Sequence, residues 1–407
     1  MRDVAVIGCG TAGAAAAIFL ARAGHRVTVY ERVPVPQPIG AGIVLQPTGQ
    51  SVLARLGLLA PIVAKGARLD GLVCVTAEGR TIVDLTYELV DGAVFGLGLH
   101  RGVLFDTLLA AVRRETIDLR LGADVTGLRR GRDERVRVLG PGGEHLGTHD
   151  LVVVADGARS RLREHTDLAR KVTVYPWGAL WFVAKDPESR FTRRLHQTVR
   201  GTRRMLGLLP TGRGPDDADP VPNVSLYWSL RCDTLDAWRR AGLAPWRDEI
   251  LDLNPAAEPV MDQIADLSAV TLAVYHDVVM RRWHTHDVVY LGDAAHAMSP
   301  QLGQGCNLAL IDAATLADCL AAESSVAGAL AAYSARRADH LDFYQLATRW
   351  LTPFFQSDGA ALGLFRDALF GALIKVPYFA RQMAESMAGN KLGLFRAMRE
   401  LTPPDRG

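Results

Sequence analysis

The sequence contains no run of about 18 uninterrupted apolar residues, so no membrane-spanning helix is expected. Its five cysteines are odd in number and form no CxxC pair, which argues against a disulfide framework and against a zinc site. The net charge is only +2, so nothing indicates a nucleic-acid partner. No secretory signal precedes the first apolar segment, and we expect a cytoplasmic location.

The chain opens with the pattern of a strand, a glycine turn, a helix and a second strand. Residues 4–7 are a short apolar run, residues 11–23 are rich in alanine, and residues 27–30 are mostly β-branched. Together they predict a βαβ unit, and therefore a parallel sheet at the N-terminus.

Further strand and helix signals are spread over the rest of the 407 residues. We expect an α/β fold in which an interrupted Rossmann-like domain comprises residues 1–71, 98–171 and 273–340. A mainly β substrate domain would comprise residues 72–97 and 172–272. Residues 341–407 would form C-terminal helices.

A dinucleotide fingerprint, G-x-G-x-x-G, lies between the first predicted strand and the first predicted helix. Its members are Gly8, Cys9, Gly10, Thr11, Ala12 and Gly13. The glycines allow a tight turn, a close approach of the backbone to a pyrophosphate, and close helix–strand packing. Glu31 closes the second strand and can accept hydrogen bonds from ribose hydroxyls, which favours FAD or NAD over NADP. The neighbouring Arg32 would lie against the adenine or on the surface.

Two later motifs follow strands of their own. Residues 156–163 read DGARSRLR, and residues 292–307 read GDAAHAMSPQLGQGCN. With the N-terminal glycines, they match the three markers GxGxxG, DGxxSxxR and GDAAHxxxPxxGQGxN. The chain thereby resembles the group A flavoprotein monooxygenases, the family of para-hydroxybenzoate, salicylate and 3-hydroxybenzoate hydroxylases, over roughly residues 1 to 340. The resemblance implies that the interrupted Rossmann-like domain is an FAD-binding domain.

The residue types in these motifs suit a flavin. Asp293 ends a strand, where it can accept a hydrogen bond from a ribityl hydroxyl. The helix after Gly303 presents unpaired amides and a positive dipole end to the flavin edge that becomes negative on reduction. Beyond the fingerprint, Glu31 and Arg32, the resemblance implies cofactor contacts at Gly42, Arg101, Asp156, Asp293, Pro300, Gly303, Gln304, Gly305 and Asn307.

Several of these residues also have a plainer interpretation. Arg101 would otherwise cap a helix or lie on the surface, Asp156 would be a turn aspartate, and the Gln304 side chain would face the core. We interpret His296 as structural rather than catalytic. Ala297 departs from the family pattern, in which proline follows this histidine.

The resemblance implies an enzyme, an FAD-dependent monooxygenase. In the family, NADH or NADPH docks transiently and reduces the flavin, O2 adds to give a C4a-hydroperoxide, and an aromatic or polycyclic small molecule is hydroxylated. The chain has one dinucleotide motif and no redox CxxC, so the nicotinamide would not be a resident cofactor. The alternatives are a flavin reductase or dehydrogenase of the same fold, acting on an isoprenoid or an amine, and a non-enzymatic FAD-stabilised redox sensor.

The substrate face is expected in the middle β region. Alternation places Trp181 and Val183 on one face of a strand, and Ser225, Tyr227 and Ser229 on one face of another. Trp181 and Tyr227 would line an apolar pocket or simply pack the sheet. The catalytic base stays open among His100, His196, His276 and Tyr227.

An apolar stripe at Leu362, Phe365, Leu369 and Leu373 marks the C-terminal helices. We expect it to dock on the flavin domain or on a second subunit of a homodimer, in preference to a membrane surface.

Overall fold

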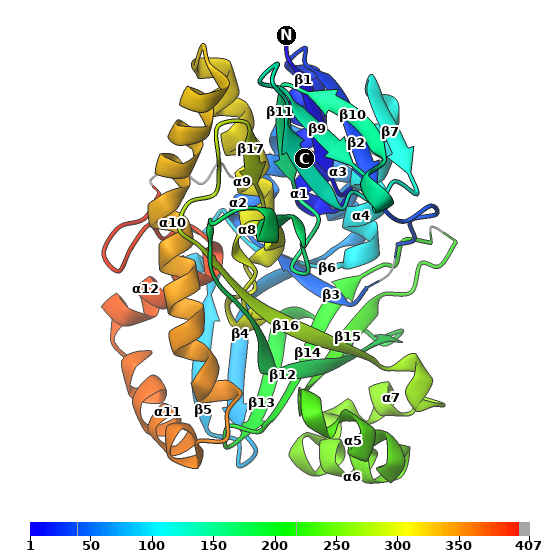
Figure 1. Ribbon diagram of the computed structural model, residues 1–407. Helices are drawn as coiled ribbons and strands as arrows, with labels where there is room; N and C mark the ends of the chain where they lie inside the picture. Colours follow the sequence, from blue (N-terminus) through cyan, green and yellow to red (C-terminus); the bar gives the residue numbers. More distant parts are fainter. Residues whose placement is uncertain (39, 217, 399–407) are drawn as a thin grey trace.

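The computed structural model describes residues 1–38, 40–216 and 218–398, so residues 399–407 of the predicted helical segment lie outside the described residues. A parallel sheet occupies the upper part of the molecule and a large sheet the lower part, and helix α10 (Val326–Phe355) runs beside both (Figure 1). This arrangement confirms the predicted α/β class with a β-rich second region and C-terminal helices.

The parallel sheet has the strand order β17-β11-β1-β2-β7. These strands are β17 (Val288–Tyr290), β11 (Leu151–Val154), β1 (Asp3–Ile7), β2 (Arg26–Glu31) and β7 (Ile117–Leu121). Its three central strands are almost entirely buried, as expected where helices cover both faces. A small antiparallel sheet lies beside it, formed by β8 (Gly127–Arg130), β9 (Val136–Leu139) and β10 (His145–His149).

The large sheet has nine strands, in the order β16-β12-β15-β14-β13-β4-β6-β3, with β5 paired to β4. Its strands are β16 (Thr271–Met280), β12 (Ala169–Lys185), β15 (Asn223–Arg231), β14 (Arg204–Gly212), β13 (Arg193–Arg200), β4 (Ala67–Thr76), β5 (Thr81–Thr86), β6 (Gly96–His100) and β3 (Gly42–Leu45). One face packs on α10 and the last two helices, and the other on three short helices.

The helices fall into three groups. Those of the upper part are α1 (Thr11–Arg22), α2 (Pro47–Arg55), α3 (Leu59–Lys65), α4 (Arg101–Arg114), α8 (Asp293–His296) and α9 (Gly305–Ala322). Below the large sheet lie α5 (Leu235–Ala241), α6 (Leu243–Leu253) and α7 (Glu258–Met261), and α11 (Ala360–Leu373) and α12 (Pro377–Ala388) follow α10 (Figure 1). The predicted helix over residues 101–114 is confirmed.

One helix among the described residues, α9, is long and apolar enough to cross a membrane by length and composition. Most of this stretch is buried, because α9 packs against α1, α2 and α10. Helix α9 is therefore a core helix of the part of the molecule that contains the parallel sheet.

The sheets divide the chain differently from the domain boundaries expected from the sequence. Strand β3 and the start of β4 belong to the large sheet, although residues 1–71 were assigned to the Rossmann-like domain. The segment 172–272, expected to be mainly β, also contains α5 to α7. Short strands that pair with residues more than 100 positions away carry no local signal of which sheet they join.

A buried ion network joins α8, α9 and α10. The Asp312 carboxylate accepts hydrogen bonds from the Gly292 amide at 2.8 Å and from Arg337 Nε at 2.7 Å, and it lies 2.6 Å from His296 Nε2. Burial alone would raise the pKa of Asp312, but His296 and Arg337 lower it to about 2. This network accounts for the structural role predicted for His296 and holds the turn at Gly292.

Asp312→Asn should destabilise the protein by about 3–5 kcal/mol, because the buried Arg337 guanidinium loses its counter-charge. The matched control is Asp318→Asn on the same helix, where an exposed pair with Arg55 should contribute less than about 1 kcal/mol. Urea unfolding of both variants measures the difference. The contribution of Asp312 is complete above the ordinary carboxyl pKa near 4 and is lost as the pH falls toward 2. Equal urea midpoints for the Asp312 and Asp318 variants would contradict the predicted stabilisation by the buried network.

Candidate functional site

The glycine turn after β1 has the shape that a pyrophosphate requires. Gly8 has a φ of +94°, and a Cβ there would lie 2.6 Å from the Ala155 carbonyl oxygen. A Cβ on Gly13 would lie 1.9 Å from the Gly8 carbonyl oxygen, so this glycine permits the helix–strand contact. A Cβ on Gly10 would meet nothing within 4 Å. Gly10, with Thr11 and Ala12 opening α1, therefore borders open space where backbone can approach a ligand.

Glu31 supports the same turn. One carboxylate oxygen accepts a hydrogen bond from the Cys9 amide at 2.7 Å, and the other accepts one from the Val33 amide at 2.9 Å. A carboxylate oxygen has a second lone pair, so both oxygens can still accept from ribose hydroxyls. Arg32 is exposed, and its contact with the adenine stays a prediction.

The two later motifs meet at the carboxyl ends of adjacent strands. β11 and β17 pair in parallel, which brings the segment after Val154 beside the segment after Tyr290. The Arg163 guanidinium joins the two segments, because Nη2 donates to the Ala158 carbonyl at 2.6 Å and Nη1 to the Ala294 carbonyl at 2.8 Å. Arg163 was not among the predicted site residues, although its place as the last residue of DGxxSxxR was a usable signal.

Two carboxylates lie at this junction. Asp156 Oδ1 is buried and has no hydrogen-bond partner among the described residues, and burial raises the pKa of Asp156. Asp293 is exposed at the first position of α8, directly after Gly292, whose φ is +58°. An orphaned acceptor and an exposed acceptor at the strand ends fit a ligand that carries hydroxyl donors, as the ribityl chain of FAD does.

The segment expected along the flavin edge forms a short 3-10 helix, Pro300–Leu302, then a left-handed turn at Gly303 with a φ of +62°. Helix α9 begins at Gly305, so its first amides lack partners within the helix. These free amides are what the predicted flavin contact requires.

Both polar atoms of the Asn307 side chain have protein partners, and the side chain is buried. Its Oδ1 accepts from the Gln46 amide at 2.8 Å, and its Nδ2 donates to the carbonyls of Val44 and Gly303 at 3.1 and 3.0 Å. Asn307 thus fastens β3 to the flavin-edge turn, and a cofactor contact at this position would come from its backbone.

Gln304 is also directed into the protein. Its Nε2 donates to the Met387 carbonyl at 2.8 Å, and its side chain is buried. The core-facing interpretation therefore holds for the side chain, which leaves the backbone of Gln304 for the cofactor. The contact connects the flavin-edge turn to the last helix, α12.

Gly42 and Arg101 lie where the two sheets meet. A Cβ on Gly42 would lie 2.3 Å from Thr211 Cγ2 and 2.7 Å from Ser225 Oγ, so this glycine lets β3 lie close to β14 and β15 of the same sheet. Arg101 is exposed, and its stem lies against Gly40. The cap of α4 is His100, whose Nδ1 accepts from the Gly102 amide at 3.1 Å. Helix capping is therefore done by His100, and for Arg101 both a cofactor contact and a surface position stay predictions.

The predicted pair of aromatic residues comes together on the large sheet. Trp181 and Tyr227 are register partners on β12 and β15, with ring centroids 5.1 Å apart. The Tyr227 hydroxyl accepts a hydrogen bond from Gln197 of β13, a residue that no sequence pattern singled out. Burial raises the pKa of Tyr227 well above its ordinary value, so the phenol stays neutral at physiological pH.

The candidate bases are not singled out by the structure. His100 is used as a helix cap, and its pKa is lowered by burial. His196 neighbours Gln197 on β13, so strand alternation directs it to the opposite face. Tyr227 is a neutral hydrogen-bonding group. No role as base is assigned to His276.

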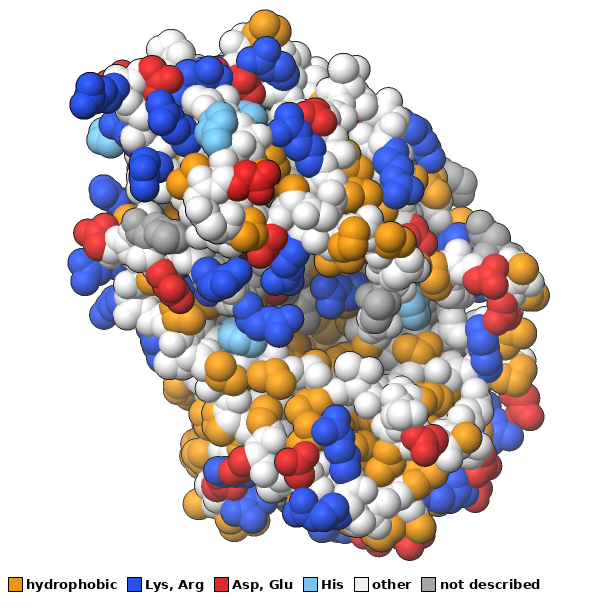
Figure 2. Space-filling view, turned by 45° about the vertical axis from the view of Figure 1, so that its right-hand side comes forward, with side chains coloured by type: hydrophobic (Ala, Val, Ile, Leu, Met, Phe, Trp, Pro, Cys, Tyr) orange, Lys and Arg blue, Asp and Glu red, His pale blue; other side chains and the backbone are white. Residues whose placement is uncertain are grey.

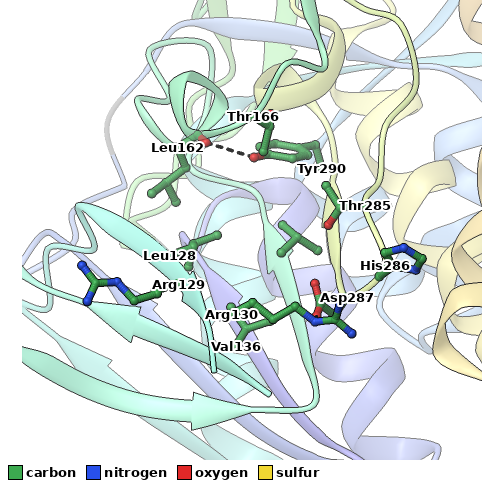
Figure 3. A pocket seen from close by; sticks show the side chains of 11 residues that line it. Leu128, Arg129, Arg130, Val136, Leu162, Thr166, Thr285, His286, Asp287 and Tyr290 are labelled. Carbon is green, nitrogen blue, oxygen red and sulfur yellow. Dashed lines mark hydrogen bonds and ion pairs between the residues drawn. The ribbon is translucent and has the colours of Figure 1, made fainter. Parts of the chain in front are cut away.

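The surface is hollowed between the upper and lower parts, with lysine and arginine side chains along the upper rim and mainly hydrophobic side chains below (Figure 2). A separate pocket of about 210 Å³ lies beside β8, β9 and the start of β17 (Figure 3). Arg130 pairs there with Asp287 at 2.9 Å, and the Tyr290 hydroxyl donates to the Leu162 carbonyl at 3.0 Å. It touches the three motifs only at Leu162, so it is not the flavin site.

Gly10→Ala should fold normally but bind FAD about 5- to 150-fold more weakly, because the added methyl group occupies the space left for the pyrophosphate. Gly92→Ala, on a loop with equally open space, is the control. Quenching of FAD fluorescence during titration of the apoprotein gives the two dissociation constants. Unchanged FAD affinity in the Gly10 variant would show that no phosphate approaches this turn.

Asn307→Asp should also weaken FAD binding, by about 1–3 kcal/mol, because a carboxylate would face the Val44 and Gly303 carbonyls without a donor. Asn254→Asp is the control. That side chain accepts from the Ala256 amide and donates to the Thr198 hydroxyl, far from the motifs, and a hydroxyl can reverse its role. The FAD dissociation rate, followed by the recovery of flavin fluorescence, should rise only in the Asn307 variant.

Comparison with known proteins agrees with this geometry. Residues 1–343 match the family model described as FAD binding domain. The chain is 30% identical to the aurachin C monooxygenase/isomerase of Stigmatella aurantiaca, over 83% of this chain and 85% of that protein. It is 31% identical to the kynurenine 3-monooxygenase of Salinispora tropica, over 83% and 77%.

Solved structures share the fold. The structure of 2-methyl-3-hydroxypyridine-5-carboxylic acid oxygenase has a TM-score of 0.76 at 23% identity, covering 95% of this chain and 96% of that one. PqsL of Pseudomonas aeruginosa, in complex with 2-aminobenzoylacetate, has a TM-score of 0.76 at 23% identity, covering 89% and 99%. The chain belongs to the FAD-binding family of the group A flavoprotein monooxygenases.

Proposed function

We propose that this enzyme hydroxylates an electron-rich aromatic small molecule, with NADH or NADPH as the electron donor and O2 as the oxygen source. The reaction would take place between the flavin segments and the face of the large sheet that carries Trp181 and Tyr227. Two linked contacts carry the proposal: Asn307 of the flavin-edge segment holds β3 at Val44 and Gln46, and Gly42 of β3 lies against Thr211 and Ser225 of the large sheet.

The chemistry that FAD would supply when bound is transfer of reducing equivalents from NAD(P)H to O2, with one oxygen atom entering the aromatic ring and the other leaving as water. The protein's own contribution is to bind, orient and shield. The open turn at Gly10 would receive the pyrophosphate, and the orphaned Asp156 Oδ1 would accept a hydrogen bond from the cofactor. The free amides at the start of α9 would stabilise negative charge at the flavin edge.

The aromatic pair holds the substrate ring and keeps water away from it. Trp181 and Tyr227 offer flat apolar surface, and the Tyr227 hydroxyl is fixed by Gln197. Because the phenol of Tyr227 stays neutral, it acts as a hydrogen-bonding group for the ring substituents and not as the base. The named relatives include monooxygenases of kynurenine and of aurachin C, which supports oxygen transfer as the reaction. A cytoplasmic location and a homodimer stay predictions.

The proposal is tested by oxidation of NADH and NADPH with and without a panel of phenols and hydroxylated nitrogen heterocycles. We expect at least one aromatic compound to stimulate cofactor oxidation together with O2 uptake, and the product to contain one atom of ¹⁸O from ¹⁸O2. Turnover of an alkene or an amine without oxygen incorporation would instead favour the reductase or dehydrogenase. Bound flavin without turnover of any compound would favour the redox sensor.

The same assay tests whether the aromatic pair contributes to substrate binding. Tyr227→Phe should raise the KM for the stimulating compound and uncouple part of the NAD(P)H oxidation from product, while Tyr378→Phe, an exposed tyrosine of α12, should change neither.

A further inference from the structure

Three neighbouring strands of the large sheet, β12, β15 and β14, carry no charge over their central parts. Residues 177–184 of β12, 205–212 of β14 and 224–230 of β15 contain no Asp, Glu, Lys, Arg or His. Alternating side chains of these stretches, such as Leu206, Leu226 and Trp228, are buried against α6 and α7 on the far face. The side chains between them lie on the opposite face, and this second set is called the neutral face below. Met205 and Leu209 of this set pack with the C-terminal helices, whereas Thr211 and Ser225 lie against Gly42 of β3.

The polar groups of the neutral face are all uncharged, and they are hydrogen-bonded to one another. Thr211 Oγ1 lies 3.3 Å from Ser225 Oγ, and both are buried under Gly42. Tyr227 is bonded to Gln197, and its ring covers Gly207, where a Cβ would lie 1.9 Å from the ring. Because Gln197 and Tyr227 are only partly buried, the amide and the phenol can serve as donor and as acceptor toward a neutral ligand.

Hydrogen bonds between two glutamine side chains connect the neutral face to the flavin-edge turn. Gln301 Nε2 donates to Gln356 Oε1 at 2.9 Å, and Gln356 Nε2 donates to Ser229 Oγ and to the Gly178 carbonyl, each at 3.1 Å. Gln356 follows α10, so the C-terminal helices complete the polar lining with neutral groups as well.

The charged residues that flank these strands are already paired. Lys185 pairs with Asp219, Arg204 with Glu249 at 2.5 Å, and Arg231 with Asp233 at 2.9 Å. Each of these cations already has a counter-charge and lies at a strand end. Arg101, on the cofactor side, is the one described cation of the predicted site at this junction that has no ion pair.

A carboxylate buried against the neutral face would therefore lose its hydration and gain no cation. An uncompensated buried charge is among the most costly arrangements in a protein, whereas a neutral ring that carries hydroxyl, carbonyl or N–H groups would satisfy the partners on offer. From this we infer that the enzyme selects a neutral aromatic substrate with hydrogen-bonding ring substituents and rejects its carboxylated analogues. The inference rests on the proposed function and narrows its substrate class.

The test uses the FAD-loaded enzyme without NAD(P)H and three ligands: 4-hydroxyquinoline, its 2-carboxamide and its 2-carboxylate. The last two have nearly equal shape and differ in charge. Perturbation of the flavin absorbance measures each dissociation constant. We expect the carboxamide to bind within about tenfold of the parent compound and the carboxylate to bind at least about 100-fold more weakly than the carboxamide. The carboxamide separates the effect of charge from that of size.

Two variants sharpen the comparison. Gln197→Lys places a cation beside Tyr227 and should narrow the carboxamide-to-carboxylate ratio at least about tenfold, while the Arg101→Gln variant, reloaded with FAD, should leave the ratio unchanged. Equal affinity for the carboxylate and the carboxamide would overturn the inference, and so would carboxylate binding that depends on Arg101. Absence of any response to the neutral ligands would overturn it too, while aromatic hydroxylation of other compounds could still uphold the proposed function.

Discussion

Three buried contacts hold the flavin-edge segment between the two halves of the molecule, and the rest of the site depends on them. Asp312 fixes the turn at Gly292 from below, Asn307 binds β3, and Gln304 binds the end of α12. Each contact uses a polar side chain that is almost fully buried, where an unmet partner costs more than the bond itself contributes. The flavin-edge turn is therefore positioned by the whole chain, including helices that follow the last motif.

This dependence explains why the motifs alone do not describe the site. Asn307 and Gln304 have the residue types expected of ligand-binding side chains, yet both side chains are buried and donate to backbone carbonyls of the protein. What they leave for a cofactor is backbone: the left-handed turn at Gly303 and the free amides that open α9. A backbone site tolerates many side chains nearby but requires an accurate position, which is what the buried contacts provide.

The chemistry is divided between the two sheets. The strand ends of the parallel sheet supply the turn at Gly10 and the carboxylates of Asp156 and Asp293, which suit a dinucleotide. The large sheet supplies an uncharged, aromatic face, which suits a flat organic ring. Asn307 connects the flavin-edge turn to β3 of the large sheet, and Gly42 lets β3 lie close to Thr211 and Ser225, from which any larger residue would separate it.

The sequence by itself determined the α/β class, the parallel N-terminal unit, the helix over residues 101–114 and the three cofactor motifs, because each depends on local periodicity or on a short pattern of residues. Alternation within single strands also placed Trp181 and Tyr227 on faces that proved to be shared. Only the tertiary structure decided that β3 joins the large sheet, that Gln197 reaches Tyr227, and that Arg163 clamps two motifs together. Those contacts join residues far apart in the chain, and the energy that selects them comes from burial and pairing that no local window of sequence contains.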